Sequence, residues 1–240
     1  MRYNVFAMPP TVTAPSRRER LRAQTLAEIR EHAYAQIAQG GPAALSLNGI
    51  AKAMGMSGPA LYRYFSSRDE LMATLVTESY EDLADTVDAA AEHARARRPE
   101  QRLGTVLDAV RKWALKAPHR YRLVFGSTYG SGELDPARIV PAAHQPMSVI
   151  LAALSDIDAG SGHTTVTDTT LRRQLARWAE NTNEPQDDPA VLLLGLTAWT
   201  RINGILSLEI EGIFTQMGIE PERLYQAEIN QLITQRTGQH

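Results

Sequence analysis

Residues 45–75, LSLNGIAKAMGMSGPALYRYFSSRDELMATL, decide the fold of this chain. Ser46 is a suitable N-cap for a short helix that ends at Gly55. A second short helix is expected after Ser57, with Pro59 in its favoured first turn. Two short helices joined by a glycine-containing turn of about three residues predict a helix-turn-helix.

The remaining sequence predicts helices throughout. Apolar residues at helical spacing predict a helix from Arg17 that stops at Gly40-Gly41-Pro42. Further helices are expected over about 69–95, 103–117, 119–125, 139–154, 171–178 and 190–217, with a last one from Pro221, and loops over 126–132 and 155–170. Because no segment has a convincing strand pattern, the fold class is all-α. We expect a flexible N-terminal arm over 1–16, a helix-turn-helix domain over 17–68, and a helical ligand-binding and dimerisation domain over 69–240.

Composition and charge narrow the class of protein. Apolar residues make up 43% and charged residues 22% of 240 residues, which is ordinary for a globular protein with a sizeable core. The absence of cysteine excludes disulfides, thiol catalysis and cysteine-bound metals. No run of about 18 apolar residues or secretory signal is found, so we expect a cytoplasmic protein without a membrane partner.

The charge is divided unevenly along the chain. Residues 1–68 carry nine basic and three acidic residues, a net charge of +6, whereas residues 69–240 carry 16 basic and 24 acidic residues, a net charge of −8. Such asymmetry predicts a basic module for a polyanion joined to an acidic body.

The helix-turn-helix suggests double-stranded DNA as that polyanion. The second helix of such a unit enters the major groove, where small residues allow close approach and polar side chains contact bases and phosphates. The alternative is that the aromatic residues belong to the core and the arginines to a solvated face. The residues predicted to contact DNA on these grounds are Asn48, Gly58, Pro59, Ala60, Tyr62, Arg63, Tyr64 and Arg68, with Arg17, Arg18, Arg20 and Arg22 adding electrostatic attraction.

The same stretch resembles the DNA-binding domain of the tetracycline-repressor (TetR) family of bacterial transcriptional regulators. The family's pattern falls on Ser46, Ile50-Ala51, Gly55-Met56-Ser57, Leu61-Tyr62, Phe65, Arg68 and Glu70-Leu71. Arg68 stands where lysine is common, which keeps a cation at that position. The resemblance implies that Ser46 and Ser57 also belong to the DNA-contacting set.

A second resemblance lies in APHRYRLVFGS and AWTRINGILSLEIEGIF, which are similar to the C-terminal domain called WHG in some TetR members. Trp199 and Gly204 match its tryptophan and glycine, whereas Asn203 stands where histidine is usual. The resemblance implies a small-molecule site in this domain and a homodimer formed by its last two helices. The alternative is that these helices complete a monomer core.

The ligand site is expected among amphipathic and aromatic side chains. A tryptophan or methionine on a helix is more often plain core than a pocket wall. The candidates are Trp113, Tyr121, Phe125, Met147, Trp178, Trp199 and Asn203. The six histidines have no metal-binding spacing, and GSTYGSG lacks the lysine of a P-loop, so we expect neither metal, cofactor nor enzymatic activity.

The sequence therefore predicts a homodimeric regulator, a repressor that a small-molecule effector releases from a palindromic operator. The alternatives are a helical module that binds RNA or protein without effector control, and an enzyme with a cryptic helical site.

Overall fold

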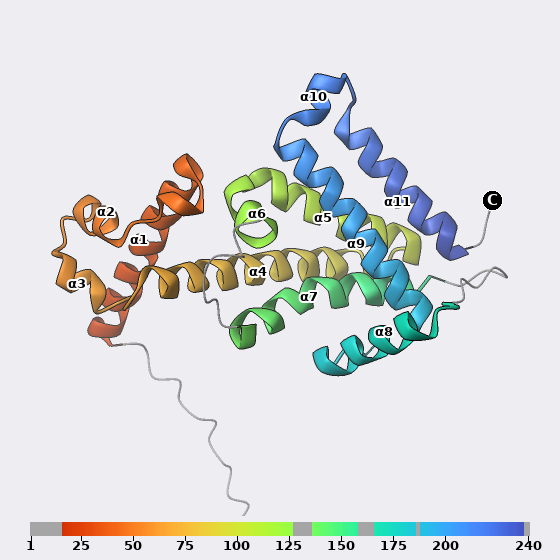
Figure 1. Ribbon diagram of the computed structural model, residues 1–240, viewed down its shortest axis with the longest axis horizontal. Coiled ribbons are helices and arrows are strands. Elements are labelled where there is room, and N and C mark those ends of the chain that lie inside the picture. Colours follow the sequence, from red (N-terminus) through yellow and green to blue (C-terminus); the bar gives the residue numbers. More distant parts are fainter. Residues whose placement is uncertain (1–15, 127–135, 158–165, 186–187, 238–240) are drawn as a thin grey trace, which may run out of the picture.

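The computed structural model describes residues 16–126, 136–157, 166–185 and 188–237, and within these ranges it contains helices and no strand. Figure 1 shows a small group of helices, α1 to α3, joined through the long α4 to a larger group. The helices are α1 (Arg17–Gly40), η1 (Pro42–Ala44), α2 (Leu47–Ala53), α3 (Gly58–Tyr62), α4 (Arg68–His93), α5 (Pro99–Lys116), α6 (Pro118–Phe125), α7 (Pro136–Ser155), α8 (Thr169–Thr182), α9 (Pro189–Ile210), α10 (Ile213–Met217) and α11 (Pro221–Thr237).

The predicted all-α class is confirmed, and most helix boundaries follow from local chemistry. Polar N-caps accept hydrogen bonds from the first helical amides, as sequence signals of this kind indicate. Such caps are Ser16, Ser46, Ser67, Asp168 and Asp188.

One helix boundary was predicted wrongly. The expected single helix over 190–217 is two helices, α9 and α10. Gly212 breaks it with a φ of 72°, in the left-handed region that glycine adopts without steric cost. The N-terminal arm up to residue 15 and the predicted loop over 126–132, except Gly126, lie outside the described residues. Of the predicted loop over 155–170, residues 158–165 lie outside them, Ser155 ends α7, and α8 begins at Thr169.

The helices enclose two hydrophobic cores, and α4 belongs to both. Its first part contributes Leu71 and Leu75 to the core of α1, α2 and α3. Its second part contributes Leu83 and Val87 to the larger core, which α5 to α9 and α11 also form. Leu123 of α6 also packs into the smaller core. The N-terminal core therefore includes residues beyond position 68, and the two groups of helices share packing.

Helix α9 packs closely on α7 at Gly195. A Cβ added to Gly195 would come within 2.4 Å of Leu151 Cδ2, so any other residue here would force the buried Leu151 side chain to shift. Among the described helices, α9 has the length and apolar composition that a membrane span would need. It packs against α5, α7, α8, α10 and α11, and a core helix has the same composition.

Tyr225 of α11 joins that helix to α5 by burial and a hydrogen bond. Its side chain is fully buried, and its hydroxyl donates to the Leu107 carbonyl oxygen at 2.6 Å. Burial, reinforced by nearby Asp108, raises the pKa of Tyr225 far above its ordinary value.

We expect Tyr225→Phe to lower the free energy of unfolding at neutral pH by about 1 kcal/mol, the value of a typical hydrogen bond. The wild type should lose stability as pH rises above about 10, because the unfolded tyrosine ionises there while the folded one stays neutral. Urea unfolding between pH 8 and 11 measures both effects. The variant should fall less steeply, and identical pH profiles would contradict the role assigned to this phenol.

Candidate DNA-binding surface and effector region

Helices α2 and α3 form the predicted helix-turn-helix. The Ser46 hydroxyl accepts from the Gly49 amide at 3.2 Å and starts α2. Gly55 in the turn has a φ of 65°, a conformation that other residues rarely adopt. Leu61 of α3 and Phe65 behind it are buried and hold this segment against the core.

The opposite side of α3 faces outward. Tyr62 is 47% exposed and Arg63 is exposed, so their hydroxyl and guanidinium groups are accessible to a partner. Tyr64, which follows α3, is only half-buried, and the Arg22 guanidinium lies over its ring. The alternative interpretation makes Tyr62, Tyr64 and Phe65 core residues. It holds for Phe65, which is buried, and not for Tyr62.

The start of α3 is open, as close approach to DNA requires. Ser57 and Pro59 are exposed, and the Ser57 side chain makes no capping hydrogen bond. Gly58 and Ala60 are partly exposed, and a Cβ on Gly58 would lie 3.7 Å from the Asn48 amide oxygen. The structure thus brings Asn48 of α2 beside the beginning of α3.

Arg68 has intramolecular partners that the sequence did not indicate. Its Nε donates to the Leu45 carbonyl at 3.0 Å and its Nη2 to the Pro42 carbonyl at 2.6 Å. This guanidinium ties the start of α4 to the segment before α2. The predicted contact of Arg68 with a DNA phosphate stays a prediction. The same guanidinium would have to serve both that phosphate and the Leu45 and Pro42 carbonyls. Arg17 and Arg18 are exposed in the first turn of α1.

The larger group of helices brings several effector candidates together around α6. The Phe125 ring lies 5.4 Å from the Trp199 ring and 5.0 Å from the Tyr121 ring, between centroids. Tyr80 of α4 adds an edge-to-face contact with Phe125 at 6.1 Å. We call Tyr80, Tyr121, Phe125 and Trp199 the aromatic cluster.

Polar groups of α9 border the aromatic cluster. The Tyr121 hydroxyl donates to the Asn203 carbonyl at 3.0 Å and lies 2.9 Å from the Ser207 hydroxyl. Burial raises the pKa of Tyr121, which therefore stays a neutral hydrogen-bonding group. The Asn203 amide nitrogen donates to the Trp199 carbonyl at 2.9 Å.

The other three candidates lie elsewhere in the same core. Trp113 donates from its indole nitrogen to Asp82 at 2.8 Å. Met147 is buried in α7, and Trp178 of α8 lies edge-to-face against His144. Ring contacts therefore favour Tyr121, Phe125 and Trp199 over these three as neighbours of one ligand.

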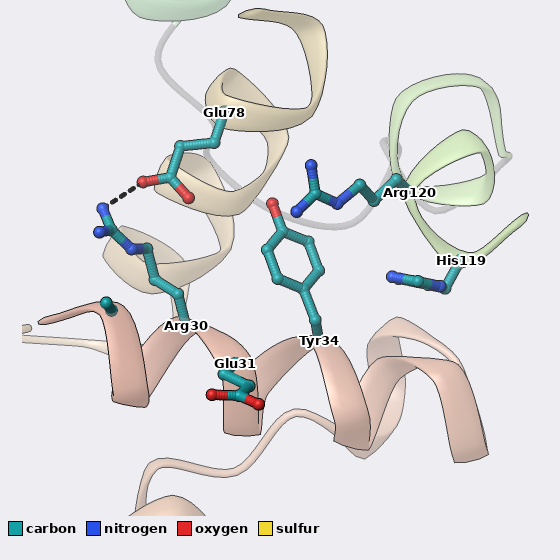
Figure 2. A pocket seen from close by; sticks show the side chains of 7 residues that line it. Arg30, Glu31, Tyr34, Glu78, His119 and Arg120 are labelled. Atoms are coloured by element: carbon teal, nitrogen blue, oxygen red, sulfur yellow. Dashed lines mark hydrogen bonds and ion pairs between the residues drawn. The ribbon is translucent and has the colours of Figure 1, made fainter. Parts of the chain in front are cut away.

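A surface hollow marks where α1, α4 and α6 meet. Figure 2 shows Tyr34 of α1 pointing into it, between the Arg30–Glu78 ion pair and the side chains of α6. The Arg120 guanidinium lies 4.5 Å from the centre of the Tyr34 ring, and the His119 ring lies 5.7 Å from it. The lining residues are Ala27, Arg30, Glu31, Tyr34, Glu78, His119 and Arg120.

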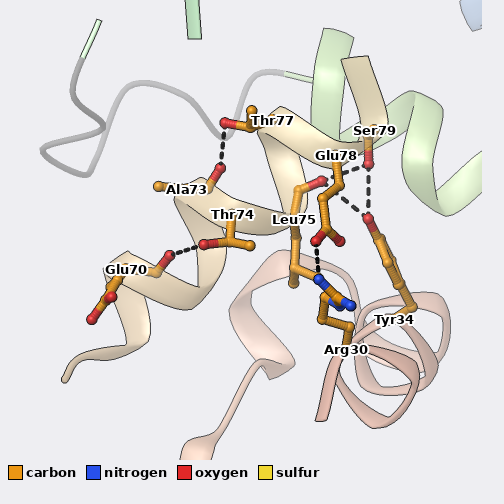
Figure 3. A network of polar contacts seen from close by, with 9 residues as sticks. All are labelled: Arg30, Tyr34, Glu70, Ala73, Thr74, Leu75, Thr77, Glu78 and Ser79. Carbon is orange, nitrogen blue, oxygen red and sulfur yellow. Dashed lines mark hydrogen bonds and ion pairs between the residues drawn. The ribbon is translucent and has the colours of Figure 1, made fainter. Parts of the chain in front are cut away.

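Hydrogen bonds anchor the Tyr34 hydroxyl on α4. It donates to the Leu75 carbonyl at 3.1 Å and lies 3.2 Å from the Ser79 hydroxyl, which itself donates to Leu75 (Figure 3). Burial raises the pKa of Tyr34, and burial together with Arg120 lowers the pKa of His119. Both groups are therefore neutral near pH 7, and Arg120 carries the local positive charge on α6.

Arg120 also bonds to Asp82 of α4 at 2.8 Å, on the carboxylate oxygen that Trp113 uses. Sequence reasoning did not select Tyr34, Asp82 or Arg120, because their partners lie about 40 residues away and follow no periodic pattern. Across the described ranges, no group of three His, Asp or Glu residues converges as metal ligands.

Family models match two parts of the chain. The model for bacterial regulatory proteins of the tetR family matches residues 29–75. The model for the tetracyclin repressor-like C-terminal domain matches residues 103–232.

Relatives match most of the chain. HTH-type transcriptional regulator Rv1816 of Mycobacterium tuberculosis is 32% identical over 222 residues, which cover 90% of this chain and 94% of that protein. The crystal structure of SCO4313, a candidate regulatory protein, is 40% identical with a TM-score of 0.76 and covers 90% of this chain and 98% of its own. The TetR family regulator PfmR of Thermus thermophilus shares the fold at 16% identity and a TM-score of 0.57, over 85% of this chain and 96% of its own.

Exposed and tethered residues of the basic module should respond differently to mutation. We expect Arg63→Ala and Tyr62→Ala to keep the melting temperature and to weaken operator binding by about 1 to 3 kcal/mol at particular base pairs. Arg68→Ala should lower the melting temperature, because the Pro42 and Leu45 carbonyls lose their donor. Thermal unfolding and footprinting on randomised operators test this, and an unchanged melting temperature for Arg68→Ala would refute the tether.

Proposed function

The chain belongs to the TetR family of transcriptional regulators, and on that premise we propose that it is a repressor whose binding to a palindromic operator is weakened by a small-molecule effector. Members of the family typically bind operator DNA, form dimers and respond to small molecules. The observation that carries the proposal is the position of α6. Its Tyr121 and Phe125 belong to the aromatic cluster, and its His119 and Arg120 contact Tyr34 of the DNA-binding module.

DNA binding rests on the exposed side of α3 and the charge of its surroundings. Tyr62 and Arg63 face outward, beside an open helix start at Gly58. The segment 1–68 has a net charge of +6, which favours the phosphate backbone. Two such modules must lie about 34 Å apart to enter successive major grooves on one face of the duplex.

Dimerisation is supported by an exposed apolar ridge on α9. Leu196 and Leu208 are 38% and 44% exposed, and Thr200 and Gly204 lie between them at four-residue spacing. A Cβ on Gly204 would have no atom within 4 Å. A leucine-flanked ridge with small central residues allows close packing against the same ridge of a second subunit.

The aromatic cluster indicates the chemistry of the effector. Ring faces of Phe125 and Trp199 suit an apolar or aromatic body, and the Tyr121 and Ser207 hydroxyls suit one hydrogen-bonding group. The Trp199-x-x-x-Asn203-Gly204 sequence further supports assignment to the WHG subclass, with Asn203 taking the histidine position. We place the protein in the cytoplasm, where its operator would be.

The proposal requires that effector and DNA affect each other's affinity equally. We expect an effector to weaken operator binding by roughly 5- to 150-fold and operator DNA to weaken effector binding by the same factor. Trp fluorescence titrations with and without DNA measure this, using substrates of the enzymes and transporters encoded beside the gene. Identical effector affinities in both titrations would remove effector control and leave DNA binding standing.

Arg120→Met should reduce this coupling factor, because it removes the contact of α6 with Tyr34 and Asp82. Arg122→Met is the matched control: this arginine lies two residues further on α6 and pairs with Glu211. The control should keep the wild-type coupling. Equal coupling factors in both variants would show that the contact of Arg120 with Tyr34 of α1 does not contribute to the coupling of effector and DNA binding.

Gly204→Leu should break the dimer without unfolding the subunit. The new side chain meets open space in the monomer, and leucine favours helix by up to about 1 kcal/mol over glycine. It would block the close approach of a second α9. We expect at least a tenfold weaker dimer by sedimentation, with unchanged helicity. Gly195→Ala on the same helix is the contrasting control, since its Cβ would collide with Leu151 and lower the melting temperature.

A further inference from the structure

The first two turns of α1 extend beyond the hydrophobic core. Residues 17–24 are all exposed, and the buried residues of α1 begin at Ile29. At 1.5 Å per residue, this extension is about 12 Å long. A helix gains no packing energy over such a stretch, so burial does not explain why it is formed.

Local hydrogen bonds hold the extension in helical form. Ser16 and Glu19 make a reciprocal capping box, in which the Glu19 amide donates to the Ser16 hydroxyl at 3.2 Å and the Ser16 amide to the Glu19 carboxylate at 2.6 Å. The bond to the Ser16 backbone lowers the pKa of Glu19. The one acidic group among residues 17–24 is thus engaged in capping, while the same stretch carries Arg17, Arg18, Arg20 and Arg22.

One of these arginines lies over the ring of Tyr64, two residues after the end of α3. The Arg22 guanidinium carbon lies 5.3 Å from the centre of the Tyr64 ring, within cation–π distance. An arginine that lies over a ring keeps the N–H groups at its edge available, and its planar fork matches the geometry of a phosphate. Figure 1 shows the N-terminal end of α1 beside α3, on the side of the module away from the larger group of helices.

Arg18 continues the same face of the helix. It precedes Arg22 by four residues, and Arg22 precedes the buried Ile29 by seven, so the three share one face. The face of α1 that carries the buried Ile29 within the core therefore carries Arg22 and Arg18 in the exposed extension. This places Arg18 one turn further out than the Arg22–Tyr64 pair.

We propose that Arg22, positioned by the Tyr64 ring, and Arg18 bind backbone phosphates of operator DNA outside the base pairs that α3 contacts. This inference rests on the proposed DNA-binding function and adds a site to it. The expected partner is the duplex backbone, because a planar guanidinium fork matches the geometry of a phosphate and because these arginines belong to α1, whereas α3 contacts the bases. The operator segment that the protein occupies is accordingly longer than its half-sites. Tyr64 is a positioning residue here, and not the direct DNA contact that the sequence predicts.

Two duplexes with the same half-sites test the proposal. One ends at the outer edges of the half-sites, and the other continues for about ten base pairs on each side. The full-length wild type should bind the longer duplex more tightly and with a steeper dependence on salt. In Arg18→Gln/Arg22→Gln, four lost phosphate contacts per dimer should reduce the slope on the longer duplex by about 3.6, at about 0.9 per contact. The variant should then show nearly equal affinity for the two duplexes.

Arg173→Gln/Arg177→Gln is the matched control, because these exposed arginines of α8 have the same spacing and the same charge change. The control should retain the preference for the longer duplex. If the Arg18/Arg22 variant also retains it while operator binding persists, the inference fails and the proposed function stands. If the wild type binds neither duplex in a salt-dependent way, both fail.

Variants of Tyr64 separate its ring from its hydroxyl. Tyr64→Phe keeps the ring beneath Arg22 and should behave as wild type, whereas Tyr64→Leu should lose part of the preference for the longer duplex. Melting temperatures establish that each variant is folded. A loss of DNA affinity in a folded Tyr64→Phe would assign the contact to the hydroxyl and overturn the positioning role.

Discussion

The burial of α4 in two hydrophobic cores is the constraint on which the rest of the molecule depends. Leu75 lies in the N-terminal core and Leu83 in the larger one, eight residues apart on one helix. An α-helix does not change its length, so the two cores stay about 12 Å apart along its axis. Any change in the larger core that moves α4 must therefore move the DNA-binding module with it.

Charge follows the same division and also holds the two parts together. The basic N-terminal segment suits a polyanion, and the acidic body repels the same partner, which directs binding to one end of the molecule. Across the junction the signs attract: Arg30 of α1 pairs with Glu78 of α4. The Arg120 guanidinium also lies over the Tyr34 ring, a cation–π contact that attracts without a carboxylate. These contacts give the junction a polar, partly exposed side, next to the apolar contact of Leu123 with the N-terminal core.

The sequence sufficed for features that depend on neighbours in the chain. Periodic apolar residues, N-cap residues and glycine stops predict the helices, and the resemblance at Ser46 to Leu71 predicts the DNA-binding module. The sequence failed at Gly212, where the apolar pattern runs on but the backbone takes a left-handed turn. It also missed the tether of Arg68 to Pro42 and the contact of Tyr34 with Ser79, which join residues 26 and 45 positions apart. Such contacts depend on how helices are arranged, and local periodicity carries no information on that arrangement. The ligand candidates were chosen by residue type, so they include both the aromatic cluster and plain core.

The energies at the junction suit a switch better than a rigid link. The Arg120–Asp82 pair is 29% and 47% exposed, and exposed pairs of this kind contribute about 0 to 1 kcal/mol. The cation–π contact with Tyr34 adds an amount of similar size. Their sum is comparable to the roughly 1 to 3 kcal/mol of typical allosteric coupling, so a modest preference of an effector for another position of α6 can exchange these contacts. Helix α6 has only eight residues, from Pro118 to Phe125, and is followed by Gly126, where a Cβ would lie 2.4 Å from the Arg122 carbonyl oxygen. The proposed mechanism treats this short helix, bounded on both sides, as one unit. In the proposed mechanism, a ligand that displaces Phe125 would shift Arg120 as well, while the buried residues of α4 would keep both cores intact.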